Sequence, residues 1–205
     1  MITIEMLDSL RKRVSRILSD KRYCHTLGVE KSALLLTEYC LPDKENEISA
    51  AALLHDITKE LDIKEQYEII SVLGEQLSEF DKISPAVLHA YSAPYKIKSD
   101  FPDFSTAEIL SAVRKHTLGD KEMSVFDEIV FLADFIEEGR IYDSSRNLRE
   151  YVYSNMTPRL FLENVEILHR ACILAIDFTS DYLTKAGKSI HPKMLEARAG
   201  IISKI

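Results

Sequence analysis

The chain repeatedly combines a polar residue, an acidic residue three positions later and a segment with apolar residues at helical spacing. This combination is typical of a helix N-terminus, because both side chains can accept backbone N–H groups that the first turn leaves unpaired. It occurs at three places: Asp62-x-x-Glu65, Ser105-x-x-Glu108 and Ser124-x-x-Asp127. The 205 residues also contain only six Gly and six Pro, so few positions would interrupt a helix. Together these features predict an all-α fold.

The expected helices follow from these starts and from the spacing of apolar residues. They cover residues 4–18, a segment from 19 or 20, 50–59, 62–73, a segment from 84, 105–116, a segment from 124, 145–153, 157–185 and 192–202, with an irregular loop at 92–104. No internal repeat or change of composition divides the chain. We therefore expect a single helical domain at 1–187 with a C-terminal helical extension at 188–205.

Composition excludes some classes of protein and favours a compartment. The net charge of −7 argues against a general surface for nucleic acids or acidic membranes, since phosphate groups are bound by basic faces. No apolar run approaches the roughly 20 residues that span a bilayer, and the first residues lack the pattern of a secretory signal. The three cysteines are scattered without a Cys-x-x-Cys spacing, which favours reduced thiols. We expect a cytoplasmic protein.

The segment Ala50–Lys59 ends an apolar run with polar side chains. As a helix it would place His55 and Asp56 four and three residues before Lys59, so that the three side chains converge. An imidazole, a carboxylate and an ammonium are costly to desolvate unless something binds them. A divalent cation would bind the first two, and an anionic substrate would bind the third.

Other histidines and one aspartate lie in apolar surroundings at or near expected helix ends. With the pair above they form a set of four imidazoles and two carboxylates: His25, His55, Asp56, His89, His116 and Asp134. Imidazoles suit transition metals, and carboxylates shift the preference from zinc towards Fe, Mn or Mg. The set has no thiolate, which argues against a structural zinc site.

The order His25, His55-Asp56 and Asp134 resembles the H…HD…D signature of the HD-domain metal-dependent phosphohydrolases. The resemblance covers about residues 10–185 and extends to the YqeK branch, the symmetrical bis(5'-nucleosyl)-tetraphosphatases. Its motifs are Arg22-Tyr23-x-His25-Thr26-x-Gly28-Val29, His55-Asp56-x-x-Lys59, His89-Ala90, His116-Thr117-x-Gly119 and Ala133-Asp134-x-Ile136-Glu137-x-x-Arg140. It implies an HD-domain helical bundle and an enzyme that cleaves diadenosine tetraphosphate into two ADP by attack of a metal-bound hydroxide.

The resemblance also implies roles for individual residues. The expected ligands of a first metal are His25, His55, Asp56 and Asp134. Two further histidines, His89 and His116, would ligate a second metal or contact substrate phosphates, and both options stay open. Fe is the expected metal, as one or two ions, with Mn, Co or Mg as alternatives. The expected catalytic residues are Asp56 and Lys59, and the expected substrate contacts are Lys59, His89, His116, Thr117 and Arg140.

The reaction explains why cationic side chains matter. Cleavage at the middle of a tetraphosphate expels ADP, whose terminal phosphate has a pKa of roughly 6 by analogy with other phosphate monoesters. Such a leaving group needs little help from a general acid, so charge neutralisation and in-line positioning are the main tasks. Lys59 and Arg140 are suited to hold the phosphates.

Some assignments remain between alternatives. Glu137 would form a surface pair with Glu138 or support a ligating histidine, and His169 is expected to be non-catalytic. The aromatic residues of the 90–104 segment would pack the loop or stack on an adenine: Tyr91, Tyr95, Phe101 and Phe104. Leu88 and Glu138 differ from the Trp and Pro that the family often has.

Other substrates and a different kind of protein are also alternatives. The same metal site would serve a cyclic dinucleotide, an alarmone or a deoxynucleotide. A non-enzymatic helical module that binds a nucleotide or a protein is a third option. The expected partner is a small nucleotide rather than a nucleic acid or a membrane, and the oligomeric state, including a homodimer, stays open.

Overall fold

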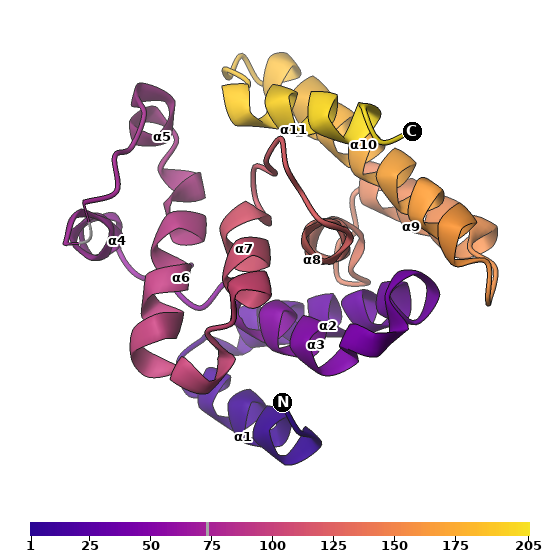
Figure 1. The fold of residues 1–205 in the computed structure, drawn as a ribbon. Helices are drawn as coiled ribbons and strands as arrows, with labels where there is room; N and C mark the ends of the chain where they lie inside the picture. Colours follow the sequence, from indigo (N-terminus) through magenta and orange to yellow (C-terminus); the bar gives the residue numbers. More distant parts are fainter. Residues whose placement is uncertain (73) are drawn as a thin grey trace.

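The structure, a computed structural model, describes residues 1–72 and 74–205, and all of its regular elements there are helices (Figure 1). The first half contains α1 (Ile4–Val14), α2 (Asp20–Cys40), α3 (Glu45–Leu54), α4 (Ile63–Ser71), α5 (Glu79–Ile83) and α6 (Leu88–Asp100). The second half contains α7 (Ala107–Lys115), α8 (Val125–Ile136), α9 (Asp143–Asn155), α10 (Phe161–Lys185) and α11 (Pro192–Ile202). Short 3-10 turns at Pro42–Lys44, Pro85–Val87 and Pro102–Phe104 precede α3, α6 and α7. The predicted all-α fold is confirmed.

Several helices begin where their sequence signals predict. Both hydrogen bonds of the capping box are present at the starts of α4 and α8, and the Ser19 hydroxyl accepts the backbone N–H of Arg22 at the start of α2. The predicted box at Ser105 is wrong by one residue. Thr106 is the N-cap of α7, because the Ser105 hydroxyl donates to the carbonyl of Pro102 at 2.7 Å and so belongs to the preceding turn.

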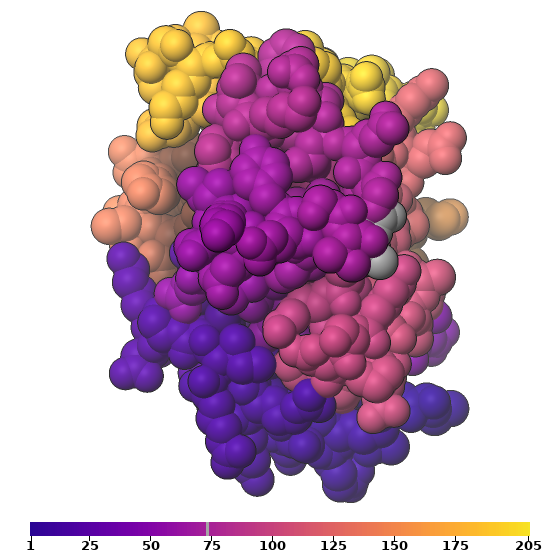
Figure 2. Space-filling model, turned by 90° about the vertical axis from the view of Figure 1, so that its left-hand side faces the viewer, coloured from indigo at the N-terminus to yellow at the C-terminus, as the bar shows by residue number. Residues whose placement is uncertain are grey.

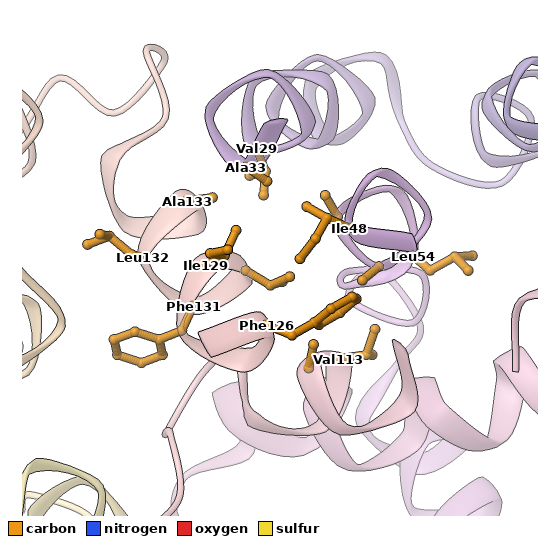
Figure 3. Packing of buried hydrophobic residues seen from close by; sticks show 14 of the residues in the cluster. Val29, Ala33, Ile48, Leu54, Val113, Phe126, Ile129, Phe131, Leu132 and Ala133 are labelled. Carbon is orange, nitrogen blue, oxygen red and sulfur yellow. The ribbon is translucent and has the colours of Figure 1, made fainter. Parts of the chain in front are cut away.

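Helix α8 lies inside the hydrophobic core and fixes one wall of the site described below. It packs against α2, α3 and α7, and also against α9 and α10. Figure 3 shows Phe126 and Ile129 directed towards Ile48 of α3, whereas Phe131 and Leu132 point away from that group. Burial of each such side chain stabilises the fold by roughly 1.5–3 kcal/mol. Contacts with several neighbouring helices therefore fix the position of α8 and of its C-terminal turn.

The bundle has two distinct ends. Helices α10 and α11 pack together across one end, and α1 lies at the opposite end (Figure 1). The face between them is covered by α4, α5 and α6, as Figure 2 shows. Within the described part of the chain, no helix combines the length and the apolar character that a bilayer crossing requires.

The predicted helix at 50–59 is wrong in its second half. Helix α3 ends at Leu54, and residues 55–60 form successive turns. The His55 Nδ1 atom lies 2.6 Å from the carbonyl oxygen of Ala52 and so bonds to a carbonyl group in the last turn of α3. The backbone N–H groups of Ile57 and Lys59 then bond to carbonyls three residues earlier, at 3.2 and 2.9 Å. The histidine and the aspartate that follow α3 therefore lie on a turn rather than within a helix.

The predicted loop at 92–104 is also wrong, because α6 continues through Pro94 to Asp100. A proline inside a helix costs about 3 kcal/mol. Here α6 packs against both α4 and α7, and Tyr91 and Ile97 are fully buried. This packing outweighs the local preference.

Other predicted boundaries also differ from the structure. The predicted helix from 84 begins as a 3-10 turn at Pro85–Val87, and α6 starts at Leu88. The longest helix begins at Phe161 rather than at 157, because the Asn164 side chain bonds both backbone groups of Thr157 and Arg159 has a positive φ of 69°. Helix α1 ends at Val14 rather than at 18. The predicted inclusion of Leu73 in α4 lies outside the described residues.

Candidate functional site

The predicted ligand set comes together at one place in the bundle. Helix α2 provides His25, the turn after α3 provides His55 and Asp56, and α6 and α8 provide His89 and Asp134. The C-cap of α7 provides the sixth member, His116. Segments distant in the sequence therefore contribute to one cluster.

The carboxylate of Asp56 joins the two halves of this cluster. Its Oδ1 lies 3.2 Å from Nε2 of His89 and 3.7 Å from Nε2 of His116. Its Oδ2 lies 3.3 Å from Nε2 of His55 and 3.8 Å from Nε2 of His25. One carboxylate thus faces four imidazoles.

Two overlapping groups of three have the spacing of metal ligands. In each, the potential ligand atoms lie within 4.8 Å of one another, and His55 belongs to both groups. One group adds His25 and Asp134, whose atoms Nε2 and Oδ1 are 3.1 Å apart. The other adds Asp56 and His116. The arrangement offers ligands for one ion or for two ions that share a ligand.

Three of the four histidines are oriented through Nδ1, the ring nitrogen that faces away from the cluster. The Nδ1 atoms of His55 and His116 each lie 2.6 Å from a carbonyl oxygen three residues earlier. The Nδ1 atom of His25 lies 3.1 Å from a carboxylate oxygen of Glu137. The backbone carbonyl of His89 accepts the Thr58 hydroxyl at 3.0 Å. The Nε2 atoms of the other three histidines are therefore presented to the cluster, and Nε2 of His89 faces Asp56 at 3.2 Å.

The cluster leaves buried nitrogen atoms without partners. Among the described residues, Nε2 of His25 and Nε2 of His55 are the buried imidazole nitrogens that make no hydrogen bond. A buried polar atom without a partner is costly. A cation bound between these nitrogens and the two carboxylates would remove that cost, so the residues fit a divalent transition metal.

The protonation states of both carboxylates and of His89 agree with this fit, whereas the pKa of His55 is raised in the metal-free cluster, because burial is outweighed by Asp56. Burial would raise the pKa of Asp56, but the charge of His55 and the neighbouring imidazoles outweigh it and hold the pKa well below its ordinary value. Burial would likewise raise the pKa of Asp134, but the Arg140 guanidinium lowers it well below the ordinary value. Burial lowers the pKa of His89 well below its ordinary value. Two anionic carboxylates and a neutral imidazole are the forms that bind a metal.

Cationic side chains surround the cluster. Arg140 donates to Asp134 Oδ1 at 2.6 Å and to the Asp134 carbonyl at 3.0 Å. The ammonium of Lys59 lies 3.2 Å from Nδ1 of His89, and burial lowers the pKa of Lys59. The Thr117 hydroxyl lies 3.1 Å from Nε2 of His89. Local positive charge is thus present in a chain whose net charge is −7.

A cavity of about 770 Å³ opens beside the cluster, with His25, Arg22 and Arg140 in its wall. A smaller cavity of about 320 Å³ shares Arg140 and Tyr142 with it. The rings of Phe135, Phe178 and Tyr182 line this second cavity, between α8 and α10. The two spaces together provide a charged region next to an aromatic one.

Two residues of the site, Arg22 and Glu137, were not clearly predicted: Arg22 had no expected role, and Glu137 had two alternative ones. Arg22 donates to Asp56 Oδ2 at 2.8 Å, and its position three residues before His25, on the same helix face, was the available signal. Glu137 is buried, with 4% of its surface exposed, and contacts His25, whereas Glu138 is exposed and pairs with Lys31.

His169 and three of the four aromatic residues of the 90–104 segment lie outside the cluster. His169 lies 2.6 Å from the Glu128 carboxylate. The rings of Tyr91, Phe101 and Phe104 are buried in the core, which supports packing rather than stacking on a base.

Comparisons with known proteins agree with this geometry. The family model described as HD domain matches residues 22–139. The chain is 28% identical over 180 residues to a symmetrical bis(5'-nucleosyl)-tetraphosphatase of Halalkalibacterium halodurans, covering 87% of each protein. It is 27% identical over 180 residues to one of Bacillus subtilis, covering 87% of this chain and 88% of the other. A crystal structure of a predicted HD superfamily hydrolase involved in NAD metabolism, from Clostridium acetobutylicum, matches with a TM-score of 0.82 and 26% identity over the whole of both chains.

Proposed function

The chain is a hydrolase that belongs to the HD domain family, and from that membership we propose that it cleaves diadenosine tetraphosphate symmetrically into two ADP with the help of a divalent metal. The relatives named above carry that activity in their names at 27–28% identity. The observation that carries the proposal is the buried cluster itself, in which two imidazole nitrogens make no hydrogen bond within the described part of the chain.

We propose that His25, His55, Asp56 and Asp134 hold a first metal, with Fe expected and Mn, Co or Mg as alternatives. The 3.0 Å separation between Nε2 of His89 and Nε2 of His116 supports a second ion, or a phosphate oxygen, near that pair. When bound, such a metal supplies Lewis acidity that activates water and withdraws charge from the attacked phosphoryl group.

The residues of the chain would then neutralise and orient the substrate. Lys59 and Thr117 can donate to phosphate oxygens from one side of the cluster, and Arg22 and Arg140 can do so from the large cavity. The developing charge on the leaving ADP is stabilised by these fixed cations, so the reaction needs little proton donation. Asp56 stays ionised, and so keeps its imidazole neighbours directed at the reacting centre.

The aromatic cavity next to Arg140 is where we propose that an adenine ring rests. Stacking on Phe178 and Tyr182 would leave the phosphates on the side of the metal cluster. Replacing Phe178 with Ala should raise KM for diadenosine tetraphosphate and leave kcat nearly unchanged. A lower kcat with an unchanged KM would contradict this placement.

The decisive experiment is an assay of metal-free protein loaded with Fe²⁺ or Mn²⁺. We expect diadenosine tetraphosphate to yield ADP alone, and chelation to abolish the reaction. A mixture of ATP and AMP would contradict the symmetrical cut.

The same assay separates the alternative substrates. Cyclic dinucleotides, alarmones and deoxynucleotides should be hydrolysed at lower kcat/KM than diadenosine tetraphosphate. A higher kcat/KM for one of them would move the activity to that substrate. Protein that binds no metal and hydrolyses none of them would support a non-enzymatic module. The proposal includes a catalytic domain at 1–187 with a helical extension at 188–205.

A further inference from the structure

Glu137 is a buried carboxylate directly behind a predicted metal ligand. It follows the last residue of α8, and only 4% of its surface is exposed. Its Oε1 lies 3.1 Å from Nδ1 of His25, and its Oε2 accepts the backbone N–H of Gly139 at 2.6 Å. A buried carboxylate is unfavourable unless its oxygens have such partners.

The place of His25 in its helix explains why it needs this partner. His55 and His116 stand at the C-caps of α3 and α7, where carbonyls of the last turn are not used by the helix. Their Nδ1 atoms bond to those carbonyls. His25 lies inside the long helix α2, Asp20–Cys40, whose carbonyls bond along the helix. Its Nδ1 atom therefore requires an acceptor from another segment.

Two glycines leave room for the acceptor. A Cβ added to Gly28, one turn after His25, would lie 2.4 Å from Oε2 of Glu137. A Cβ added to Gly139 would lie 2.9 Å from both oxygens of the same carboxylate. Glycine inside a helix is unfavourable relative to alanine. The position of Gly28 in α2 is therefore explained by the close approach of the carboxylate.

A side chain of α9, Arg149, fixes the backbone of the turn that carries Glu137. The Arg149 guanidinium donates to the carbonyl oxygens of Ile136, Glu137 and Arg140. The carboxylate thus projects from a turn whose geometry is set by packing between α8 and α9.

We propose that Glu137 is a positioning residue that holds His25 in the tautomer protonated at Nδ1, so that the lone pair of Nε2 points into the metal cluster. Both ring nitrogens of His25 lie 3.1 Å from a carboxylate oxygen, but of the two contacts that with Glu137 has the geometry of a hydrogen bond. Because an ionised carboxylate can only accept, the proton of a neutral imidazole is placed on Nδ1. The proposal rests on the metal site proposed above, but the tautomer can be measured without any metal.

The first test measures the tautomer of His25 in metal-free protein by nitrogen and carbon NMR of the imidazole. The His25 signals are identified by their loss in His25→Gln. We expect the Nδ1–H form in the parent protein and a shift to mixed or Nε2–H tautomers in Glu137→Ala. Glu138→Gln, a change at the exposed neighbour, serves as the matched control and should leave the tautomer unchanged. An Nδ1–H tautomer that persists in Glu137→Ala would overturn the proposal.

The second test measures the affinity for Mn²⁺ by calorimetry, with folding checked by circular dichroism. Glu137→Ala should weaken binding by about 10- to 100-fold, the usual effect of removing the partner of a ligating histidine. Glu137→Gln should weaken it less, because the amide oxygen can still accept from Nδ1. A parent protein that binds no Mn²⁺ would contradict the proposed metal site and leave the tautomer result to decide the role of Glu137.

A double-mutant cycle distinguishes positioning from a general effect on the fold. Gly28→Ala should displace the carboxylate and weaken Mn²⁺ binding, as Glu137→Ala does. In the Glu137→Ala background the same glycine change should cause no further loss, since its Cβ then meets no carboxylate. Additive losses of affinity would show that Gly28 acts independently, and would overturn this part of the proposal.

Discussion

Helix α8 carries two carboxylates, Glu128 and Asp134, whose surroundings differ. Glu128 is fully buried, and its two oxygens lie 2.6 Å from Nδ1 of His169 and 2.5 Å from the ammonium of Lys204. Six residues later, Asp134 faces His25 and belongs to the cluster in which two imidazole nitrogens have no hydrogen-bond partner among the described residues. Each carboxylate is paired with a cationic side chain, Lys204 for Glu128 and Arg140 for Asp134, so charge balance does not separate the two clusters. A buried histidine beside a carboxylate is therefore not by itself a metal site, and unpaired nitrogen atoms distinguish the two.

The largest expected effect comes from replacing Asp56 with Asn. This change removes the carboxylate that faces four imidazoles, so hydrolysis of diadenosine tetraphosphate should fall by at least roughly 1,000-fold, which corresponds to about 4 kcal/mol. Steady-state kinetics with Mn²⁺ measures it. Glu128→Gln is the counterpart in the other cluster and should keep kcat at temperatures where the variant is folded. Equal losses in both variants would remove the distinction between the clusters.

Addition of metal should have the next largest effect. At free Mn²⁺ of 100 times Kd, binding to the native state adds about 2.7 kcal/mol, and Tm of metal-free protein should rise by roughly 5–10 °C. Asp134→Asn should lose most of this rise in a thermal scan. Asp177→Asn, which removes a carboxylate paired with Arg198 near the surface, should retain it. The same melting temperature for the parent with Mn²⁺ and with chelator would contradict a metal site.

A smaller effect is expected from Lys204→Met in the cluster of Glu128, His169 and Lys204. Loss of the ammonium leaves part of the buried charge of Glu128 unpaired, and the free energy of unfolding should fall by about 2 kcal/mol. Urea unfolding measures this, with the exposed Lys188→Met as the control. Affinity for Mn²⁺ should stay the same. A weaker affinity would show that the two clusters are coupled through α8.

The smallest expected effect is that of Lys59→Met in the proposed metal site. Removing a phosphate donor while leaving the metal ligands in place should lower kcat/KM by about tenfold, or about 1.4 kcal/mol. Lys64→Met, an exposed lysine on α4, should leave kcat/KM unchanged. A loss of Mn²⁺ binding in Lys59→Met would indicate that Lys59 supports the ligands rather than the substrate.

Sequence patterns predicted the parts of the site that depend on residue type. Six candidate ligands were predicted from imidazoles and carboxylates in apolar surroundings, and the structure brings all six together. The contact between Arg22 and Asp56 was not predicted, because it joins α2 to the turn after α3. The burial of Glu137 was only one of two alternatives, since exposed acidic pairs at helix ends are common and nothing local distinguishes them.

The sequence by itself determined the helical class, the starts of α2, α4 and α8, and the residue types of the proposed ligands. Those features depend on hydrogen bonds between residues three or four apart and on the side chains themselves. Tertiary structure decided that α6 continues through Pro94 and that one glycine in α2 makes room for the carboxylate of Glu137, which follows α8. These outcomes depend on packing between distant segments, whose energy exceeds the local preferences that a sequence pattern records.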